Sequence, residues 1–175
     1  MPYANETHHG RCDGPDIETP GVQIRTMTQD DIERVVGIDA EWSQQRRPNY
    51  FALQIKRARE ASSLHISLVA EVDAIVVGFA VGTVYYGEFG LLETSATIDA
   101  IGVQKRFRGR SVGRALLRQL RLNLAALRVT TVRTEVSWDD FELLGFLQRE
   151  GFKPATRLCL EAILDPTTPE SDGAE

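Results

Sequence analysis

The segment from Thr94 to Leu117 constrains the fold most, because it passes from a strand pattern to a helix pattern through a short loop of glycine and arginine. "TSATIDAIGV" is rich in β-branched residues, and "RFRGRSVGRALL" follows with four arginines and two glycines. Unpaired N–H groups at a helix N-terminus and nearby guanidinium groups suit a phosphate or pyrophosphate. Gly109 and Gly113 would let the main chain approach such an anion. The segment predicts a strand–loop–helix unit with an anion site, and a solvated basic helix start is an equal alternative.

The loop matches neither of two common phosphate-binding patterns. It has no Gly-Lys-Ser/Thr ending and so is not a P-loop, and it lacks the GxGxxG spacing of a dinucleotide site. The net charge of −5 over 175 residues disfavours a nucleic-acid-binding function. No apolar run is long enough to cross a bilayer, and two cysteines do not make a disulfide framework. We expect a reduced, cytoplasmic protein without a membrane partner.

Three parts of the chain differ in composition. Residues 1–20 are rich in Gly, Pro, Asp and Asn without periodicity, which predicts a loose N-terminal arm, and residues 165–175 predict a loose tail in the same way. His8, His9 and Cys12 lie in this arm without a set of partner ligands, so we expect no metal site. Residues 21–164 carry the periodic patterns and are long enough to form one domain with its own core.

Within residues 21–164 the patterns change between strand and helix. Thr28 followed by Asp31 is typical of a capping box that opens a helix. "DA" at 73–74 between two β-rich runs indicates a hairpin. The predicted strands are 22–27, 65–72, 74–86, 94–103, 129–138 and 152–164, and the predicted helices follow Thr28 and cover 51–61, 112–127 and 139–151. This order predicts an α/β (α+β) fold, a mixed sheet flanked by helices.

"IDAIGVQKRFRGRSVGRALL" resembles the acyl-CoA-binding motif of the GCN5-related N-acetyltransferase (GNAT) family, in which a strand enters a loop of the form Arg/Gln-x-x-Gly-x-Gly/Ala and then a helix. The loop here runs from Arg108 to Gly113, and Ser111 stands where the family usually has glycine. Serine is a good helix N-cap and can donate to a phosphate, so we expect the site to be kept. "WDDFELLGFLQREGF" resembles the family's later helix. The resemblance implies a single GNAT-like domain with a mostly antiparallel sheet and helices on both faces.

The resemblance also implies acetyl-CoA as co-substrate and direct acetyl transfer to a primary amine of a small molecule or protein. The strand backbone at Ile101, Gly102 and Val103 would pair with pantetheine and polarise the thioester carbonyl. Asp140, where the family often has asparagine, is assigned to the cofactor site, although Asp139 and Asp140 also fit a helix N-terminal pair. The pyrophosphate would be held by the loop residues Arg108, Gly109, Arg110, Ser111, Val112, Gly113 and Arg114.

One position departs from the family pattern. Leu147 stands where a tyrosine often protonates the departing thiolate, so the usual acid is missing. A thiol has a reference pKa of about 8.5, so a side-chain acid is helpful but not obligatory. Asp99, expected on the same strand face as Thr97 and Ile101, and Glu135 on the neighbouring strand are the candidate general bases. Alternatively, either carboxylate is purely structural and holds a loop or an arginine.

The sequence defines the acceptor side less well. Leu147 favours the main alternative function, a non-catalytic acyl-CoA-binding or sensing module. The apolar run 158–164 would form an edge strand that supports a homodimer, with Cys159 as a small core residue. Trp42 and Trp138 are expected in the core, with a place beside the cleft as the alternative. An amine acceptor is suggested by carboxylates expected near the cleft: Glu88, Glu93, Asp99 and Glu135.

Overall fold

The computed structural model describes residues 21–59, 65–86, 94–156 and 159–163. Contacts group the chain into two compact units, of which the first ends at Glu135 and the second begins at Val136. The predicted arm and tail, and the two glutamates of the 87–93 loop, lie outside the described residues. The domain bounds inferred from the sequence therefore stay a prediction.

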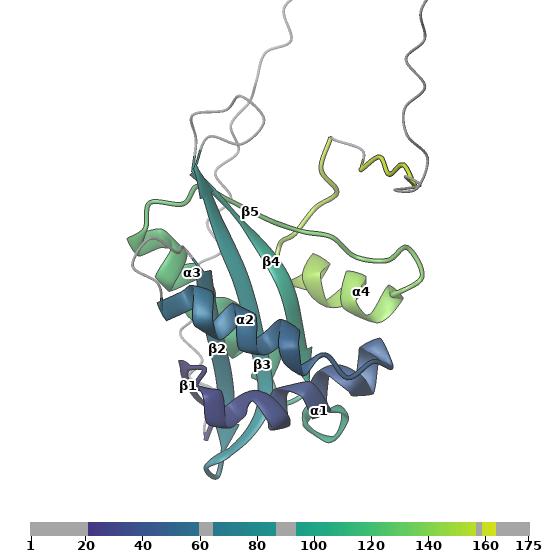
Figure 1. Cartoon of the computed structure of the whole chain (residues 1–175). Coiled ribbons are helices and arrows are strands. Elements are labelled where there is room, and N and C mark those ends of the chain that lie inside the picture. Colours follow the sequence, from purple (N-terminus) through teal and green to yellow (C-terminus); the bar gives the residue numbers. More distant parts are fainter. Residues whose placement is uncertain (1–20, 60–64, 87–93, 157–158, 164–175) are drawn as a thin grey trace, which may run out of the picture. The chain divides into compact units, whose positions relative to one another are not determined.

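The first unit is built on a five-stranded sheet in the order β1-β2-β3-β4-β5 (Figure 1). Neighbouring strands are antiparallel except for β4 and β5, which are parallel, so the predicted mixed, mostly antiparallel sheet is confirmed. The hairpin at Asp73 and Ala74 is also confirmed, with φ of 51° and 60°, the left-handed geometry of a two-residue turn. The strands are β1 (Gln23–Thr26), β2 (His65–Val72), β3 (Ile75–Tyr86), β4 (Thr94–Val103) and β5 (Thr131–Thr134).

Helices cover both faces of this sheet, as predicted, with α1 and α2 on one face and α3 on the other (Figure 1). Adjacent residues of β3 show the division. The ring of Phe79 lies 5.2 Å from that of Phe51 in α2, whereas a Cβ at Gly78 would lie 3.2 Å from Leu116 of α3. Alternation along β3 thus gives each face its own core. The helices of this unit are α1 (Ile32–Ser43), α2 (Pro48–Arg59) and α3 (Val112–Ala126).

Aliphatic side chains hold these layers together. Val35 of α1 and Leu116 and Leu120 of α3 are at most 1% exposed. Each such side chain contributes about 1.5–3 kcal/mol by leaving water. Leu124, near the end of α3, is 3% exposed, whereas Leu127, the last residue of the predicted helix, is 39% exposed because α3 ends one residue earlier. The buried side of α3 therefore extends from Val112 to Leu124.

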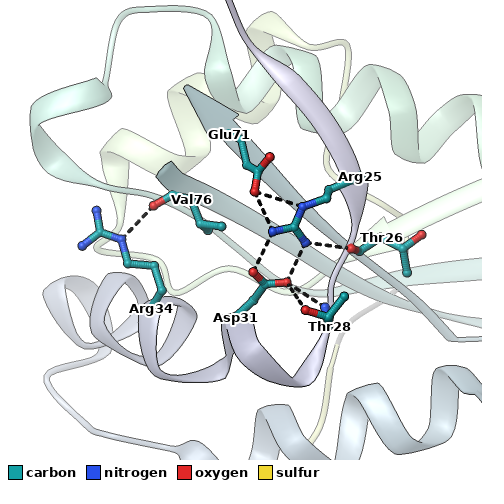
Figure 2. Close-up of polar contacts among 7 residues, drawn as sticks. All are labelled: Arg25, Thr26, Thr28, Asp31, Arg34, Glu71 and Val76. Atoms are coloured by element: carbon teal, nitrogen blue, oxygen red, sulfur yellow. Dashed lines mark hydrogen bonds and ion pairs between the residues drawn. The ribbon is translucent and has the colours of Figure 1, made fainter. Parts of the chain in front are cut away.

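An ion-pair cluster joins β1, β2 and the start of α1 (Figure 2). The Arg25 guanidinium donates to both Asp31 oxygens at 2.7 and 2.8 Å and to Glu71 at 2.6 and 2.9 Å. The Asp31 carboxylate also accepts the Thr28 backbone N–H at 2.7 Å, which confirms the predicted capping pair. Hydrogen bonds from Arg25 and then Thr28 hold the pKa of Asp31 below its usual range despite burial. The cluster fixes the connection between the end of β1 and the start of α1.

The second unit contains α4 (Phe141–Arg149), and its described residues after this helix do not form the strand predicted there. Residues 152–156 and 159–163 carry no strand, and Leu160 and Ile163 are 88% and 97% exposed. Pro154 cannot donate to a strand ladder. Among the described residues of this unit the apolar run also has no partner strand. The expected edge strand is therefore wrong for these residues.

Three neighbouring expectations are corrected as well. β5 ends at Thr134, short of the predicted 138, and pairs with β4 over four residues. Cys159 is exposed, and Trp138 is 91% exposed, so neither lies in a core. Both residues belong to stretches without helix or strand, which give them no packed face to join.

Candidate functional site

β4 carries an irregularity at Asp99. The register between β3 and β4 shifts between Val81, which pairs with Ala100, and Gly82, which pairs with Ile98. Asp99 is therefore an extra residue that faces no partner across the ladder. A β-bulge of this kind breaks the strict alternation of side chains and redirects one of them.

The bulge corrects the predicted placement of Asp99. Thr97 pairs with Thr83, and Ile101 pairs with Ala80, so Thr97 and Ile101 lie on opposite faces of the sheet. The Asp99 carboxylate accepts a hydrogen bond from Thr83 Oγ1 at 2.6 Å. Asp99 therefore shares a face with Thr97 and not with Ile101. This is the α1/α2 face, because Phe79 and Val81, which occupy alternate positions of β3 together with Thr83, pack in the core with α1 and α2.

β5 covers only part of the β4 edge. The two strands pair over Ser95–Ile98, and the last pair joins Ile98 to Thr134. β4 continues to Val103, so among the described strands residues 99–103 have no partner on this side. Gly102 lies against the Phe79 ring, which a Cβ would approach to 2.7 Å. The three predicted backbone positions, 101–103, thus lie on an extended strand with an open edge.

The predicted anion loop joins β4 to α3. After a 3-10 turn at Lys105–Phe107, Gly109 and Ser111 have φ of 69° and 59°, both left-handed. Left-handed turn residues beside a helix start gather N–H groups in a way that is typical of anion sites. Residues 112–114 add first-turn N–H groups that have no acceptor within the helix. Ser111 is the N-cap residue, but its side chain caps no N–H, because its backbone lies outside the extended region that such capping uses.

Trp42, in the last turn of α1, holds this loop. The Arg108 guanidinium carbon lies 3.3 Å from the centroid of an indole ring, and the Lys105 ammonium lies 5.0 Å away. The indole N–H donates to the Val103 carbonyl at 3.3 Å, and Glu41 accepts the Lys105 backbone N–H at 2.9 Å. Trp42 is thus half-buried beside the loop rather than in the core that was favoured for it. Cation–π stacking fixes Arg108 while its charge is kept.

Neutral groups also orient two more arginines of the loop, Arg106 and Arg110. Arg106 and Arg110 lie over the Phe107 ring, at 4.9 and 5.4 Å from its centroid. Arg106 also donates to the Gln104 side-chain oxygen at 3.0 Å, and Arg34 of α1 donates to the same oxygen at 2.9 Å. Contacts with a ring and an amide orient guanidinium groups without neutralising them. The loop can therefore present positive charge to an anion.

Three side chains from three adjacent strands form a chain of hydrogen bonds on the α1/α2 face. His65 Nδ1 lies 2.9 Å from Thr83 Oγ1, and Thr83 Oγ1 lies 2.6 Å from Asp99 Oδ2. His65 and Thr83 are direct partners across β2 and β3. Sequence reasoning missed both, because a histidine or threonine in a strand belongs to no motif until the register is known. We call His65, Thr83 and Asp99 the polar chain.

α2 adds Tyr50 to this face. Burial, and after it the charge of Asp99, raises the pKa of the Tyr50 phenol, which therefore stays protonated at neutral pH. Arg47 lies over the Tyr50 ring at 5.0 Å and pairs with Asp39 of α1 at 2.7 Å. No local pattern in the sequence points to these three residues, because they meet only when α1 and α2 pack together.

Glu135, the second predicted base, is exposed and directly follows the last residue of β5. Its position matches that of Asp99 on β4, because each comes one residue after the last β4–β5 pair. The register therefore brings the two candidate carboxylates to the point where the strands separate. Asp99 alone has a side-chain hydrogen bond that defines its orientation in the described structure.

The remaining predicted residues belong to the second unit. The Asp140 carboxylate accepts the Leu143 N–H at 2.9 Å, and Asp139 accepts a hydrogen bond from the Ser137 hydroxyl. The first contact makes Asp140 the N-cap of α4, as the helix N-terminal alternative expects, whereas Asp139 precedes it and bonds to Ser137 instead. The cofactor role of Asp140 stays a prediction. Leu147 is 4% exposed, so it is a packed apolar side chain on α4.

A family model for the acetyltransferase (GNAT) domain matches residues 63–154, more than half of the chain. The match includes the polar chain, the open β4 edge, the loop and α4. This protein therefore belongs to the GNAT acetyltransferase family, and the resemblance in its sequence is confirmed. The protein is therefore an acetyltransferase.

Three solved structures with a similar fold carry different descriptions. A transcriptional regulator from Bacillus halodurans C-125 is 19% identical, with a TM-score of 0.71 over 82% of this chain and 99% of that chain. The aminoglycoside N-acetyltransferase AAC(6')-Iy, in complex with CoA, is 17% identical, with a TM-score of 0.69 over 81% and 94%. A ribosomal-protein-alanine N-acetyltransferase from Brucella melitensis biovar Abortus 2308 is 18% identical, with a TM-score of 0.64 over 82% and 99%. These likenesses show the fold and do not select an acceptor.

The described part of the chain holds no group of three or more His, Cys, Asp or Glu side chains arranged for a metal ion. None of the helices in this part is both long enough and apolar enough to traverse a bilayer.

Proposed function

We propose that this protein transfers the acetyl group of acetyl-CoA directly to a primary amine of a small molecule or protein. One observation carries the proposal. The first unit joins an open strand edge at 99–103, a basic loop at a helix N-terminus, and a carboxylate at the bulge where that edge begins. Membership of the GNAT family and the CoA complex of the similarly folded AAC(6')-Iy support the use of acetyl-CoA.

The loop fits a pyrophosphate. At Gly109 a Cβ would meet nothing within 4 Å, so the main chain there is open to an approaching anion. The first-turn N–H groups of α3, together with Arg108, Arg110 and Arg114, would add charge-assisted hydrogen bonds. The extended backbone at 101–103 would pair with the amides of pantetheine and donate an N–H to the thioester oxygen.

The Asp99 carboxylate would accept a proton from the acceptor ammonium. The neutral nitrogen then attacks the thioester carbon, the C–N bond forms as the C–S bond breaks, and the nitrogen's second proton leaves for the thiolate or solvent. Leu147 cannot donate a proton, so the thiolate, with a reference pKa of about 8.5, leaves without an acid from that position. A carboxylate beside the open edge also attracts a cationic amine.

The alternative is a non-catalytic acyl-CoA-binding or sensing module. Leu147 favours it, because a buried leucine replaces the tyrosine that acts as acid in much of the family. The two functions agree on cofactor binding and differ in turnover. A single experiment can therefore separate them.

The test is calorimetric titration with acetyl-CoA, followed by an assay of thiol release with polyamines, aminoglycosides, amino acids and peptides. We expect binding, release of CoA thiol and an acetylated product with at least one amine. Arg108→Glu should weaken binding, whereas Arg121→Glu, a charge reversal further along α3, should not. Binding without thiol release from any amine would support the sensing module, and absence of binding would overturn both.

A further inference from the structure

The hydrogen bonds of Thr83 have a fixed direction. A hydroxyl carries one hydrogen, and an ionised carboxylate can only accept. Thr83 Oγ1 therefore donates to Asp99 Oδ2, at 2.6 Å, and accepts from His65 Nδ1, at 2.9 Å. It follows that His65 carries a hydrogen on Nδ1 whether its ring is neutral or charged.

We propose that His65 and Thr83 are positioning residues for Asp99, and that the His65 ring makes the Thr83 hydroxyl an obligatory donor to that carboxylate. The proposal rests on the proposed function, which makes Asp99 the group that deprotonates the amine. His65 and Thr83 act through Asp99 and have no assigned contact with the substrate.

Asp99 needs such support because of its place in the strand. It is the extra residue of a bulge and is exposed, so neither a ladder partner nor packing fixes its side chain. The hydrogen bond from Thr83 holds Oδ2 and presents Oδ1 to an approaching ammonium. In the transfer step the proton moves from nitrogen to Oδ1 while Oδ2 keeps its bond to Thr83, so no further reactant is needed.

Other charged or titratable groups also lie on this face. Tyr50 of α2 stays protonated, because burial and then the Asp99 charge raise its pKa. The Arg47 and Asp39 pair lies beside Tyr50. Arg133 of β5 pairs with Thr97, and Glu135 follows the end of β5. α3 packs against the opposite face. The hydrogen bond from the Thr83 hydroxyl is the side-chain contact that orients Asp99 in the described structure.

A purely structural role predicts a different result. If the polar chain only tied β2, β3 and β4 together, its loss would lower stability and leave kcat of the folded protein unchanged. If it positions Asp99, its loss lowers kcat in a protein that is still folded, and a variant that keeps the hydroxyl restores kcat. The carboxyl carbon-13 signal of Asp99 at pH 7 reports the same contact and requires no substrate.

Two matched pairs of variants test the proposal. Thr83→Val keeps the shape and removes the hydroxyl, whereas Thr83→Ser keeps it. His65→Leu removes the donor, whereas His65→Asn places an amide N–H near the position of Nδ1. The measurements are the carboxyl carbon-13 chemical shift of Asp99 in the full chain at pH 7, kcat and KM, and the melting temperature.

We expect Thr83→Val to shift the Asp99 carboxyl signal and to lower kcat about tenfold with little change in KM. His65→Leu should lower kcat by a smaller factor, and Thr83→Ser and His65→Asn should keep kcat near the wild-type value. An unchanged Asp99 signal and an unchanged kcat in folded variants would overturn the positioning role and leave the proposed function intact. A shifted Asp99 signal in a protein that acetylates no amine would overturn the proposed function and leave the contact between Thr83 and Asp99 standing. If Thr83→Val does not fold, the histidine pair alone decides.

Discussion

The loop at residues 104–114 and the polar chain would serve the proposed site by different means. The loop is a continuous stretch whose key groups are main-chain N–H groups at a turn and a helix start. The polar chain consists of side chains from three strands, joined by two hydrogen bonds. Main-chain donors survive the truncation of a side chain, whereas the polar chain is broken by one substitution. The effects of single substitutions should therefore be larger in the polar chain than in the loop.

The largest effect is expected from Asp99→Asn. The amide keeps the size of the side chain and removes the group that accepts the proton, so kcat should fall about a hundredfold or more. The loss should shrink as pH rises, because more of the acceptor amine is then already neutral. The measurement is a pH–rate profile with any accepted amine, with Glu135→Gln as the matched carboxylate control. A profile like that of the wild type for Asp99→Asn would move the base to Glu135 or water.

The Arg25 and Asp31 cluster lies outside both regions and provides a reference for effects on stability alone. The pKa of Asp31 is lowered in the folded protein, so its contribution to stability is complete above its unfolded value of about 3.9 and is lost as pH falls through the folded value. Asp31→Asn should lower the free energy of unfolding by about 2 kcal/mol at pH 7. The difference in the free energy of unfolding between Asp31→Asn and the wild type, measured by denaturant titration, should become smaller toward pH 2. Asp30→Asn, an exposed neighbour, is the control, and an equal loss there would refute the assignment.

The loop is tested by Gly109→Val. A side chain at this left-handed position costs about 1–2 kcal/mol, so the turn should distort and acetyl-CoA affinity should fall about tenfold. Gly21→Val is a matched control, because Gly21 is also left-handed with nothing within 4 Å of a Cβ. Both variants should lose similar stability, and calorimetry should find weaker binding only for Gly109→Val. Equal affinities would show that the loop is not the anion site.

The smallest effect is expected from Leu147→Phe. A residue that donates no proton can be replaced at little chemical cost, so kcat should change less than twofold. Overpacking of this buried position should lower stability by about 1 kcal/mol, which thermal unfolding would detect. Activity that vanished in a folded variant would mean that α4 contributes to the chemistry in a way that the sequence pattern does not reveal.

The loop region was predictable because its signals are local. A β-rich run, two glycines and a leucine pattern follow one another, and each acts within a few residues. The order of strands and helices along the chain also followed from such patterns, whereas the helices on both faces followed from the family resemblance. The strand predicted at 152–164 was wrong for the described residues of that range, because an apolar run indicates strand potential, whereas strand formation also needs a partner edge.

The polar chain could be predicted only in part. Asp99 was identified as a candidate base, but it was wrongly placed on the same face of the sheet as Ile101. The extra residue at the bulge reverses which face each later side chain of β4 points to. His65 and Thr83 required the β2–β3–β4 register, which no local pattern contains. Tyr50 required the packing of α2 on the sheet. Contacts between distant segments are therefore the part of the site that the sequence left open.

The stacking of Arg108 on Trp42 gives this protein an optical reporter of its own loop. The chain has two tryptophans, and Trp138 is 91% exposed, so its fluorescence is that of an indole in water. Trp42 lies half-buried under a guanidinium group, which perturbs its excited state. Trp138→Phe would leave one emitter, and a ligand that draws Arg108 away from the ring would change its intensity. Stopped-flow fluorescence could then follow cofactor arrival in real time without a label.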